Sequence, residues 1–126
     1  MKAIIVDDSR AMRMLLKRLL ASVGFNTLIE AAHGKEALDR LAEHGAFDLA
    51  LVDWNMPEMN GIEFDIAVRS MAEYDAMRMM MVTTETETDQ IVQALSAGAN
   101  EYMMKPFTAE ALREKLQILG LAGDSG

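Results

Sequence analysis

Residues 49–53 are Leu49-Ala50-Leu51-Val52-Asp53, four apolar residues followed by an acid. A strand with one face in water alternates apolar and polar residues, whereas this stretch is suited to burial on both faces. Strands buried on both faces are typical of parallel sheets that helices cover on each side. The stretch therefore predicts a central strand of a layered α/β domain.

Similar short apolar runs recur along the chain. Their length of about four to six residues, with turn residues or charges beside them, suits strands. The runs are Ala3–Val6, Met79–Val82 and Tyr102–Met104, with a more polar run at Phe25–Ile29. Together with Leu49–Val52, they predict five strands.

Amphipathic stretches separate these runs, with apolar residues at the three- and four-residue spacing of a helix. Candidate N-caps begin three of them: Ser9, Asn60 and Thr108. Asn60 and Glu63 have the spacing of a capping box, and the helix after them has an apolar stripe that includes Ile62 and Ile66. The predicted helices run from Ser9 to Gly24, over Gly34–His44, from Asn60 onward, over Glu87–Ala97 and from Thr108 to Leu119.

Five strands alternating with five helices predict a doubly wound parallel sheet, because crossovers between parallel strands are right-handed. The length of 126 residues suits a single domain. We expect this domain at residues 1–120, followed by a disordered tail at 121–126 that is rich in Gly, Asp and Ser.

The composition argues against several kinds of site and partner. The chain has 12 basic and 20 acidic residues, a formal net charge of −8, which disfavours sequence-independent nucleic-acid binding. It has no cysteine and two histidines, which excludes disulfides, thiolate zinc sites and a His-rich metal site. No apolar run approaches the ~20 residues of a membrane span. We expect a cytoplasmic monomer that binds neither nucleic acid nor a membrane.

Polar residues end four of the predicted strands. Asp7 and Asp8 follow the first, Asp53 the third, Thr83 the fourth and Lys105 the fifth. The carboxyl ends of parallel strands share one edge of the sheet, where ligands bind in such folds. Three carboxylates repel one another unless a cation joins them, and a site made only of oxygen ligands suits Mg²⁺. With an ammonium and a hydroxyl beside the metal, the site suits a phosphoryl group that a carboxylate attacks in line.

Several segments of the chain match one family pattern. They are Val6-Asp7-Asp8-Ser9, Asp53-Trp54-Asn55-Met56-Pro57, Met81-Val82-Thr83, Ala97-Gly98-Ala99 and Tyr102 through Lys105-Pro106-Phe107. In these segments the chain resembles the receiver domains of two-component response regulators, and among them the single-domain chemotaxis regulators. The resemblance covers residues 2 to about 119. It implies a flavodoxin-like sheet with the strand order 2-1-3-4-5.

The resemblance implies a phosphorylation site with Mg²⁺ as its cofactor. Asp53 is the implied phospho-acceptor, which takes its phosphoryl group from the phosphohistidine of a histidine kinase. The implied direct ligands of Mg²⁺ are Asp8, Asp53 and the backbone carbonyl of Asn55, and Asp7 would hold a metal-bound water.

The resemblance also implies a switch. Lys105 would pair with the phosphoryl group, and the bond from Lys105 to Pro106 is expected to be cis. Thr83 would swing to hydrogen-bond the phosphoryl group, and Tyr102 would change rotamer as Thr83 moves. The face around the fourth helix, fifth strand and fifth helix would then change shape for a partner to recognise.

The implied partners are a chemotaxis-type histidine kinase, a phosphatase and one output protein. That output is a flagellar motor switch protein or a histidine phosphotransfer protein. Thr84 and Glu87 depart from the chemotaxis pattern, which usually has a small residue and a lysine there. Thr84 is expected to slow exchange with small phosphodonors, and Glu87 makes the output face more acidic. A phosphate sink or a phosphorelay intermediate is therefore the alternative to motor control.

Two other protein classes use a similar sheet. A haloacid dehalogenase-type phosphatase needs Asp-x-Asp after its first strand, whereas this chain has Asp7-Asp8. A flavodoxin-like FMN carrier needs a Ser- and Thr-rich phosphate loop there, and Asp7 and Asp8 would repel its phosphate. We therefore expect a signalling domain that catalyses only its own phosphorylation and dephosphorylation.

Arg10, Arg13 and Lys17 form a basic stripe on the first predicted helix. We interpret the stripe as a solvated face that balances nearby acids. Docking of a kinase or a phosphatase is the alternative.

Overall fold

The computed structural model describes residues 1–54, 59–83, 88–105 and 107–121, with the backbone alone at 88–90. Its centre is a five-stranded parallel sheet in the order β2-β1-β3-β4-β5. The strands are β1 (Lys2–Val6), β2 (Thr27–Ala31), β3 (Leu49–Asp53), β4 (Arg78–Thr83) and β5 (Glu101–Met104). The predicted fold class and strand order are confirmed.

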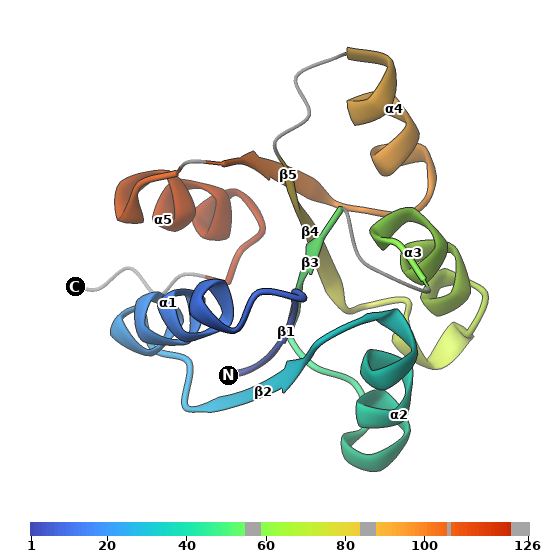
Figure 1. The fold of residues 1–126 in the computed structure, drawn as a ribbon, viewed down its shortest axis with the longest axis horizontal. Helices are drawn as coiled ribbons and strands as arrows, with labels where there is room; N and C mark the ends of the chain where they lie inside the picture. The colour runs from blue at the N-terminus through green and yellow to red at the C-terminus, as the bar shows by residue number, and fades with distance from the viewer. Residues whose placement is uncertain (55–58, 84–87, 106, 122–126) are drawn as a thin grey trace.

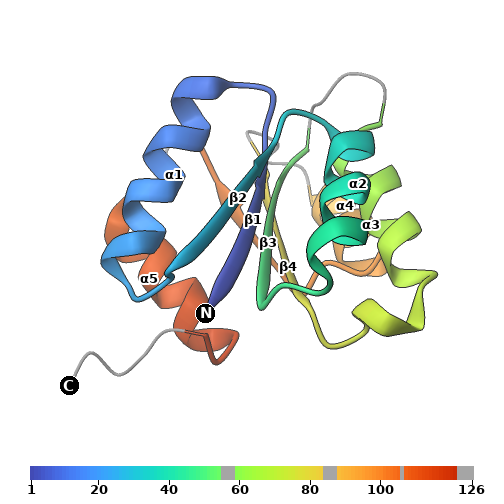
Figure 2. The same cartoon turned by 90° about the horizontal axis from the view of Figure 1, so that it is seen from below.

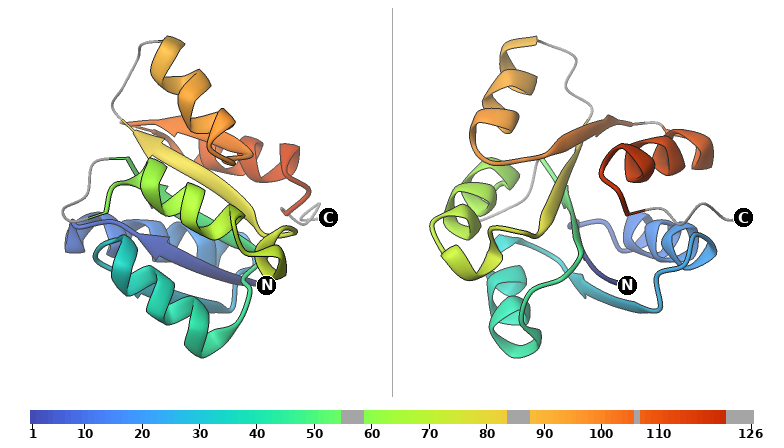
Figure 3. Two further views of the ribbon diagram at one scale, coloured as in Figure 1. Left: turned by 90° about the vertical axis from the view of Figure 1, so that its right-hand side faces the viewer. Right: turned by 180° about the vertical axis from the view of Figure 1, so that it is seen from behind.

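In the described part of the chain, five α-helices cover the two faces of the sheet. They are α1 (Arg10–Ser22), α2 (Gly34–His44), α3 (Gly61–Arg69), α4 (Thr88–Ser96) and α5 (Ala109–Ile118), with a short 3-10 helix, η1 (Ala72–Tyr74), that the sequence did not predict. Helices α1 and α5 lie on one face and α2, α3 and α4 on the other (Figures 1 and 2). Figure 3 shows these last three side by side across their face.

The sheet separates two apolar layers. Along β4, Met79 and Met81 pack into the layer beneath α2, α3 and α4, while Met80 and Val82 pack into the layer beneath α1 and α5. All four side chains are buried. Each strand residue therefore needs an apolar side chain whichever way it points, which explains why the middle strands show no alternation.

Strand β2 begins at Thr27 instead of the predicted Phe25. The N–H groups of Gly24 and Phe25 still belong to the end of α1, where they bond the carbonyls of Ala21 and Leu20 at 3.3 and 3.1 Å. Gly24 has a φ of 107°, the left-handed conformation that this helix ending requires. Because α1 uses these two N–H groups, pairing with β1 starts only at Thr27.

Side-chain caps begin three helices near the strand ends, as predicted. Ser9 Oγ and Thr108 Oγ1 each accept a bond from the backbone N–H three residues later, at 3.2 and 3.0 Å. Asn60 and Glu63 form the reciprocal capping box, with bonds of 2.9 and 3.0 Å. These bonds satisfy N–H groups that the first turn of a helix leaves unpaired, and they fix where α1, α3 and α5 start.

The buried face of α3 differs from the predicted stripe. Ile66, expected on that stripe, is 55% exposed, whereas Asp65 is fully buried. Ile62, Phe64 and Val68 are buried as well. The apolar spacing of the sequence missed this face because an acid occupies one of its inward positions.

The end of α3 is joined to three neighbouring segments by Arg69. Its guanidinium donates to four acceptors at 2.8–2.9 Å: the carbonyls of Gly98, Tyr74 and Met77, and Oδ1 of Asn100. These contacts, the Arg69 clamp, tie α3 to η1, to the start of β4 and to the turn between α4 and β5.

Helix α4 lies within the predicted range Glu87–Ala97, although Glu87 itself is outside the described residues. Residues 122–126 of the predicted tail are outside them too. Within the described ranges, no helix is long and apolar enough to cross a membrane.

Candidate functional site

Four strand ends meet at one edge of the sheet. Asp7 directly follows β1, Asp53 ends β3, Thr83 ends β4 and Lys105 directly follows β5. The parallel register keeps these ends level, so that residues far apart in the chain come together.

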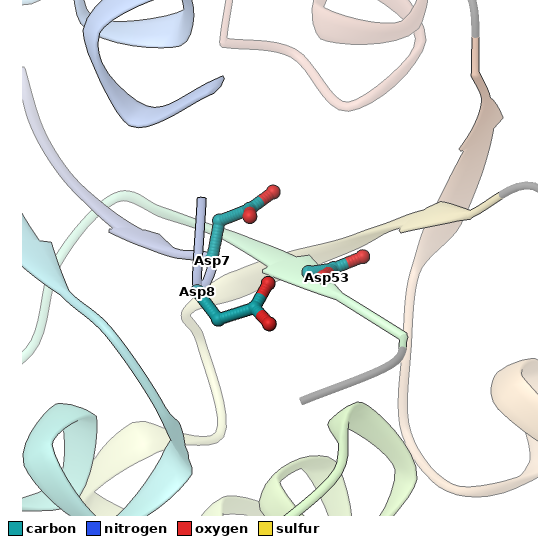
Figure 4. A group of neighbouring side chains, drawn as sticks. All are labelled: Asp7, Asp8 and Asp53. Atoms are coloured by element: carbon teal, nitrogen blue, oxygen red, sulfur yellow. The ribbon is translucent and has the colours of Figure 1, made fainter. Parts of the chain in front are cut away.

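Three carboxylates gather at this edge. Asp7, Asp8 and Asp53 each offer an oxygen, and these oxygens lie within 4.8 Å of one another. Asp7 and Asp8 extend from the end of β1 and Asp53 from the end of β3, with their carboxylates toward the same space (Figure 4). Asp7 and Asp53 are buried and Asp8 is exposed, so the cluster opens to solvent at Asp8.

Lys105 brings a positive charge to this cluster. Its Nζ lies 3.2 Å from Asp53 Oδ1 and 3.4 Å from Asp7 Oδ2. Burial acts to lower the pKa of Lys105, but the attraction of Asp53 and Asp7 outweighs it, and the pKa is raised. Lys105 is therefore an ammonium ion at physiological pH and bridges the two buried carboxylates.

Asp53 has a perturbed carboxyl group. Burial and then the charge of Asp7 raise its pKa from 3.8 to about 6, although Lys105 opposes them. Its surroundings therefore disfavour the ionised form. A cation among the three carboxylates would instead favour the ionised form of Asp53. A set of donors made only of carboxylate oxygens suits a hard ion such as Mg²⁺.

Asp7 is held by three elements. Its N–H donates to the carbonyl of Ala31 at 3.0 Å, its Oδ1 accepts from the N–H of Ser9 at 2.8 Å, and its carbonyl accepts from Arg13 at 2.5 Å. These contacts come from β2, from the cap of α1 and from α1 itself. The position of Asp7 is thus set by the fold before any ligand binds.

Thr83 and Tyr102 occupy the same face of the sheet. Thr83 is buried, and Tyr102 is half-buried and packs against the layer beneath α2, α3 and α4. Thr83 shares its side of β4 with Met81, the residue that pairs with Tyr102 on β5. Lys115 of α5 covers the Tyr102 ring, with Nζ 4.7 Å from the ring centroid.

The structure thus brings Asp7, Asp8, Asp53 and Lys105 together and ends the neighbouring strand at Thr83. Four residues that the sequence analysis named lie outside the described residues. They are Asn55 and Pro106 of the implied site, and Thr84 and Glu87, which differ from the chemotaxis pattern.

The surroundings of Arg13 were only partly predicted. Its side chain is 15% exposed rather than solvated, and it binds both Glu30 and the backbone of Asp7. Lys17 also pairs with Glu30, at 3.1 Å, so for these two residues the balancing of a nearby acid is confirmed. Glu30 directly follows the predicted run Phe25–Ile29, and this acid is the sequence signal that could have indicated the contact.

Comparison with known proteins places this geometry in a family. Residues 3–117 match the family described as response regulator receiver domain. The chain is 43% identical over 127 residues to a chemotaxis protein CheY homolog of Campylobacter jejuni, across 100% of this chain and 98% of the relative. It is 45% identical over 117 residues to the chemotaxis protein CheY of Pseudomonas aeruginosa, across 93% and 94%. The chemotaxis response regulator CheY4 of Vibrio cholerae has a similar structure, with a TM-score of 0.86 at 36% identity over 94% of this chain and 97% of the other. With matches of this extent, the chain belongs to the response regulator receiver domain family.

Proposed function

We propose that this chain is a stand-alone response regulator of a chemotaxis-type two-component system, phosphorylated on Asp53. The observation that carries the proposal is the setting of Asp53 among Asp7, Asp8 and Lys105, with its Oδ1 3.2 Å from the ammonium. Relatives that match over nearly their whole length are chemotaxis proteins by name. Residues 1–120 would act as one receiver domain, as a monomer in the cytoplasm.

Mg²⁺ is the proposed cofactor. Asp8, Asp53 and the backbone carbonyl of Asn55 would be its direct ligands, and the three carboxylates, with oxygens within 4.8 Å of one another, fit such an ion. Asp7 suits the outer position of holding a metal-bound water, because its two carboxylate oxygens already accept from Ser9 and Lys105. When bound, Mg²⁺ neutralises charge on phosphoryl oxygens.

The proposed reaction is a phosphoryl transfer from the phosphohistidine of a kinase. A carboxylate oxygen of Asp53 attacks the phosphorus in line, and the new O–P bond forms as the P–N bond of the phosphohistidine breaks. Lys105, beside Asp53, pairs with the oxygens of the transferred group. Attack by water later releases phosphate and restores Asp53, so the chain catalyses only its own modification and recovery.

The signal would be read on the face formed by α4, β5 and α5. The Thr83 hydroxyl bonds the phosphoryl group, and the space it leaves lets Tyr102 turn inward. A surface pocket of about 400 Å³ beside β5 is lined in part by Tyr102, Phe107 and Lys115, so its shape depends on the Tyr102 rotamer. A flagellar motor switch protein is the proposed occupant of this face, and a phosphatase would limit how long the signal lasts.

The acceptor is tested with Asp53→Asn. The histidine kinase of the same chemotaxis system is first labelled with radioactive phosphate on its histidine. With Mg²⁺ present, it should transfer the label to the wild-type chain and leave Asp53→Asn unlabelled. Asp39→Asn, which changes an exposed acid of α2, should be labelled like the wild type. Label retained by Asp53→Asn on another residue refutes the assignment, and labelling that persists after Mg²⁺ is chelated refutes the cofactor.

The output is tested by calorimetry with the N-terminal peptide of the flagellar switch protein. Beryllium fluoride with Mg²⁺ mimics the phosphorylated state, and fluorescence of Trp54, next to Asp53, reports its binding. Tighter peptide binding in the activated state supports motor control. Confirmed activation without peptide binding would favour a phosphate sink or a relay to a histidine phosphotransfer protein.

A further inference from the structure

Arg13 connects the acidic site to strand β2. Its Nη1 donates to the backbone carbonyl of Asp7 at 2.5 Å, and its Nε donates to Glu30 Oε1 at 3.0 Å. The other carboxylate oxygen of Glu30 accepts from Lys17 Nζ at 3.1 Å. The Arg13 side chain is 15% exposed, whereas those of Glu30 and Lys17 are 34% and 40% exposed, so the contact with the Asp7 carbonyl is the inner end of this linkage.

The carbonyl that Arg13 binds belongs to the peptide between Asp7 and Asp8. Rotation of that peptide changes the direction in which Asp8 leaves the backbone. The carboxylate of Asp7 is fixed separately by Ser9 and Lys105, whereas that of Asp8 accepts no hydrogen bond from any residue that the structure describes. Among the described residues, the contact from Arg13 is the side-chain contact made directly to the peptide that leads into Asp8.

Glu30 holds the guanidinium in place. Burial acts to raise the pKa of Glu30, but Lys17 and Arg13 outweigh it and lower the pKa, so Glu30 stays ionised at neutral pH. Because Glu30 binds Nε, the planar guanidinium of Arg13 is oriented with Nη1 toward the backbone carbonyl of Asp7. A lysine has a compact ammonium on a flexible stem and lacks the rigid fork that makes both contacts at once.

We propose that Arg13 is a positioning residue for the cation site: it orients the peptide between Asp7 and Asp8, so that the carboxylate of Asp8 meets the same ion as that of Asp53. This inference rests on the proposed function, since it concerns the Mg²⁺ site of that function. Arg13 touches backbone and Glu30 rather than the site's carboxylates, so it sets the affinity for the cation and not the chemistry of transfer.

The test compares Arg13→Met with Arg18→Met. Arg18 is exposed on the same helix and makes no ion pair with any described residue, so its loss removes the same charge without the contacts. Mg²⁺ is titrated against each chain with Trp54 fluorescence as the readout, and phosphorylation by the labelled kinase is then measured at saturating Mg²⁺. Urea unfolding confirms that each variant is folded.

We expect Arg13→Met to weaken Mg²⁺ binding by about tenfold, a size typical for the loss of a residue that supports metal ligands. Its phosphorylation rate at saturating Mg²⁺ should stay within about twofold of the wild type, because the ligands themselves remain. Arg18→Met should match the wild type in both. Arg13→Lys should recover only part of the affinity.

Glu30→Gln supplies a second measurement that does not depend on the fold of Arg13→Met. It should weaken Mg²⁺ binding less than Arg13→Met does, and the double variant should be no weaker than Arg13→Met alone, because both changes break one linkage. Folded Arg13→Met or Glu30→Gln with wild-type Mg²⁺ affinity overturns the inference and leaves the proposed function standing. A wild-type chain that does not bind Mg²⁺ overturns both.

Discussion

Replacing Asp65 with Asn is predicted to remove a large pH dependence of stability. Asp65 on α3 is fully buried, and neither of its carboxyl oxygens has a hydrogen-bond partner among the described residues. Burial raises the pKa of Asp65 from 3.8 to about 8, and the charge of Arg69, one helical turn away, opposes this only in part. The folded protein therefore keeps this carboxyl protonated at neutral pH.

The magnitude follows from the two pKa values. Below pH 3.8 the carboxyl is protonated in the folded and unfolded states, and between pH 3.8 and about 8 only the folded state holds the proton. The free energy of unfolding therefore falls as the pH rises through this window, by about 1.4 kcal/mol for each pH unit. From pH 5 to pH 7 the loss due to Asp65 is about 3 kcal/mol.

The assay is urea unfolding of the wild type and Asp65→Asn at pH 5, 6 and 7. Asn has a similar size and cannot ionise, and other titrating groups, Asp53 among them, are common to both chains. The stability of the wild type relative to Asp65→Asn should fall by about 3 kcal/mol across this range. A difference that stays constant from pH 5 to pH 7 refutes the reasoning, because it means that Asp65 titrates normally in the folded protein.

Three further substitutions test other parts of the structure. Lys105→Ala should still bind Mg²⁺ but should lose the gain in peptide affinity that beryllium fluoride produces in the wild type. If peptide titrations with and without beryllium fluoride show the same gain in Lys105→Ala as in the wild type, the role given to Lys105 is wrong. Gly98→Ala should lower the free energy of unfolding by about 2 kcal/mol, because Gly98 has a φ of 116° and an added Cβ would lie 2.3 Å from Arg69 Cγ. Gly24→Ala, at a φ of 107° with nothing within 4 Å of its Cβ, is the control, and equal losses would disprove the clash. Asn60→Ala should cost about 1 kcal/mol in urea unfolding through loss of the capping box, and an unchanged midpoint would contradict that.

The sheet and the edge that carries the site were predictable because they follow from local patterns. A run such as Leu49–Val52, apolar throughout and followed by Asp53, indicates a buried parallel strand and also where it ends. Parallel strands align their ends, so Asp7, Asp53 and Lys105 were expected together without any knowledge of side-chain packing. The functions assigned to these residues stay predictions.

The features that were missed depend on contacts between distant segments. The partner of Arg13 lies on β2, and its pairing required both the register of that strand and the rotation of α1. Asp65 occupies an inward position that an apolar spacing assigns to an apolar residue, so the sequence placed Ile66 inside instead. The start of β2 shifted because the last turn of α1 retains the N–H of Phe25.

The Arg69 clamp has a consequence for how this chain can diverge over evolutionary time. Tyr74, Met77 and Gly98 accept its bonds through backbone carbonyls, which every amino acid provides. Positions 74 and 77 can therefore exchange side chains between lineages without losing these bonds. Arg69, Gly98 and Asn100 have no such freedom: Arg69 supplies the donors, Gly98 leaves room for the Arg69 side chain, and Asn100 accepts through its own side chain. Descendants of this sequence should keep these three residues together or replace them together, while the side chains at positions 74 and 77 vary.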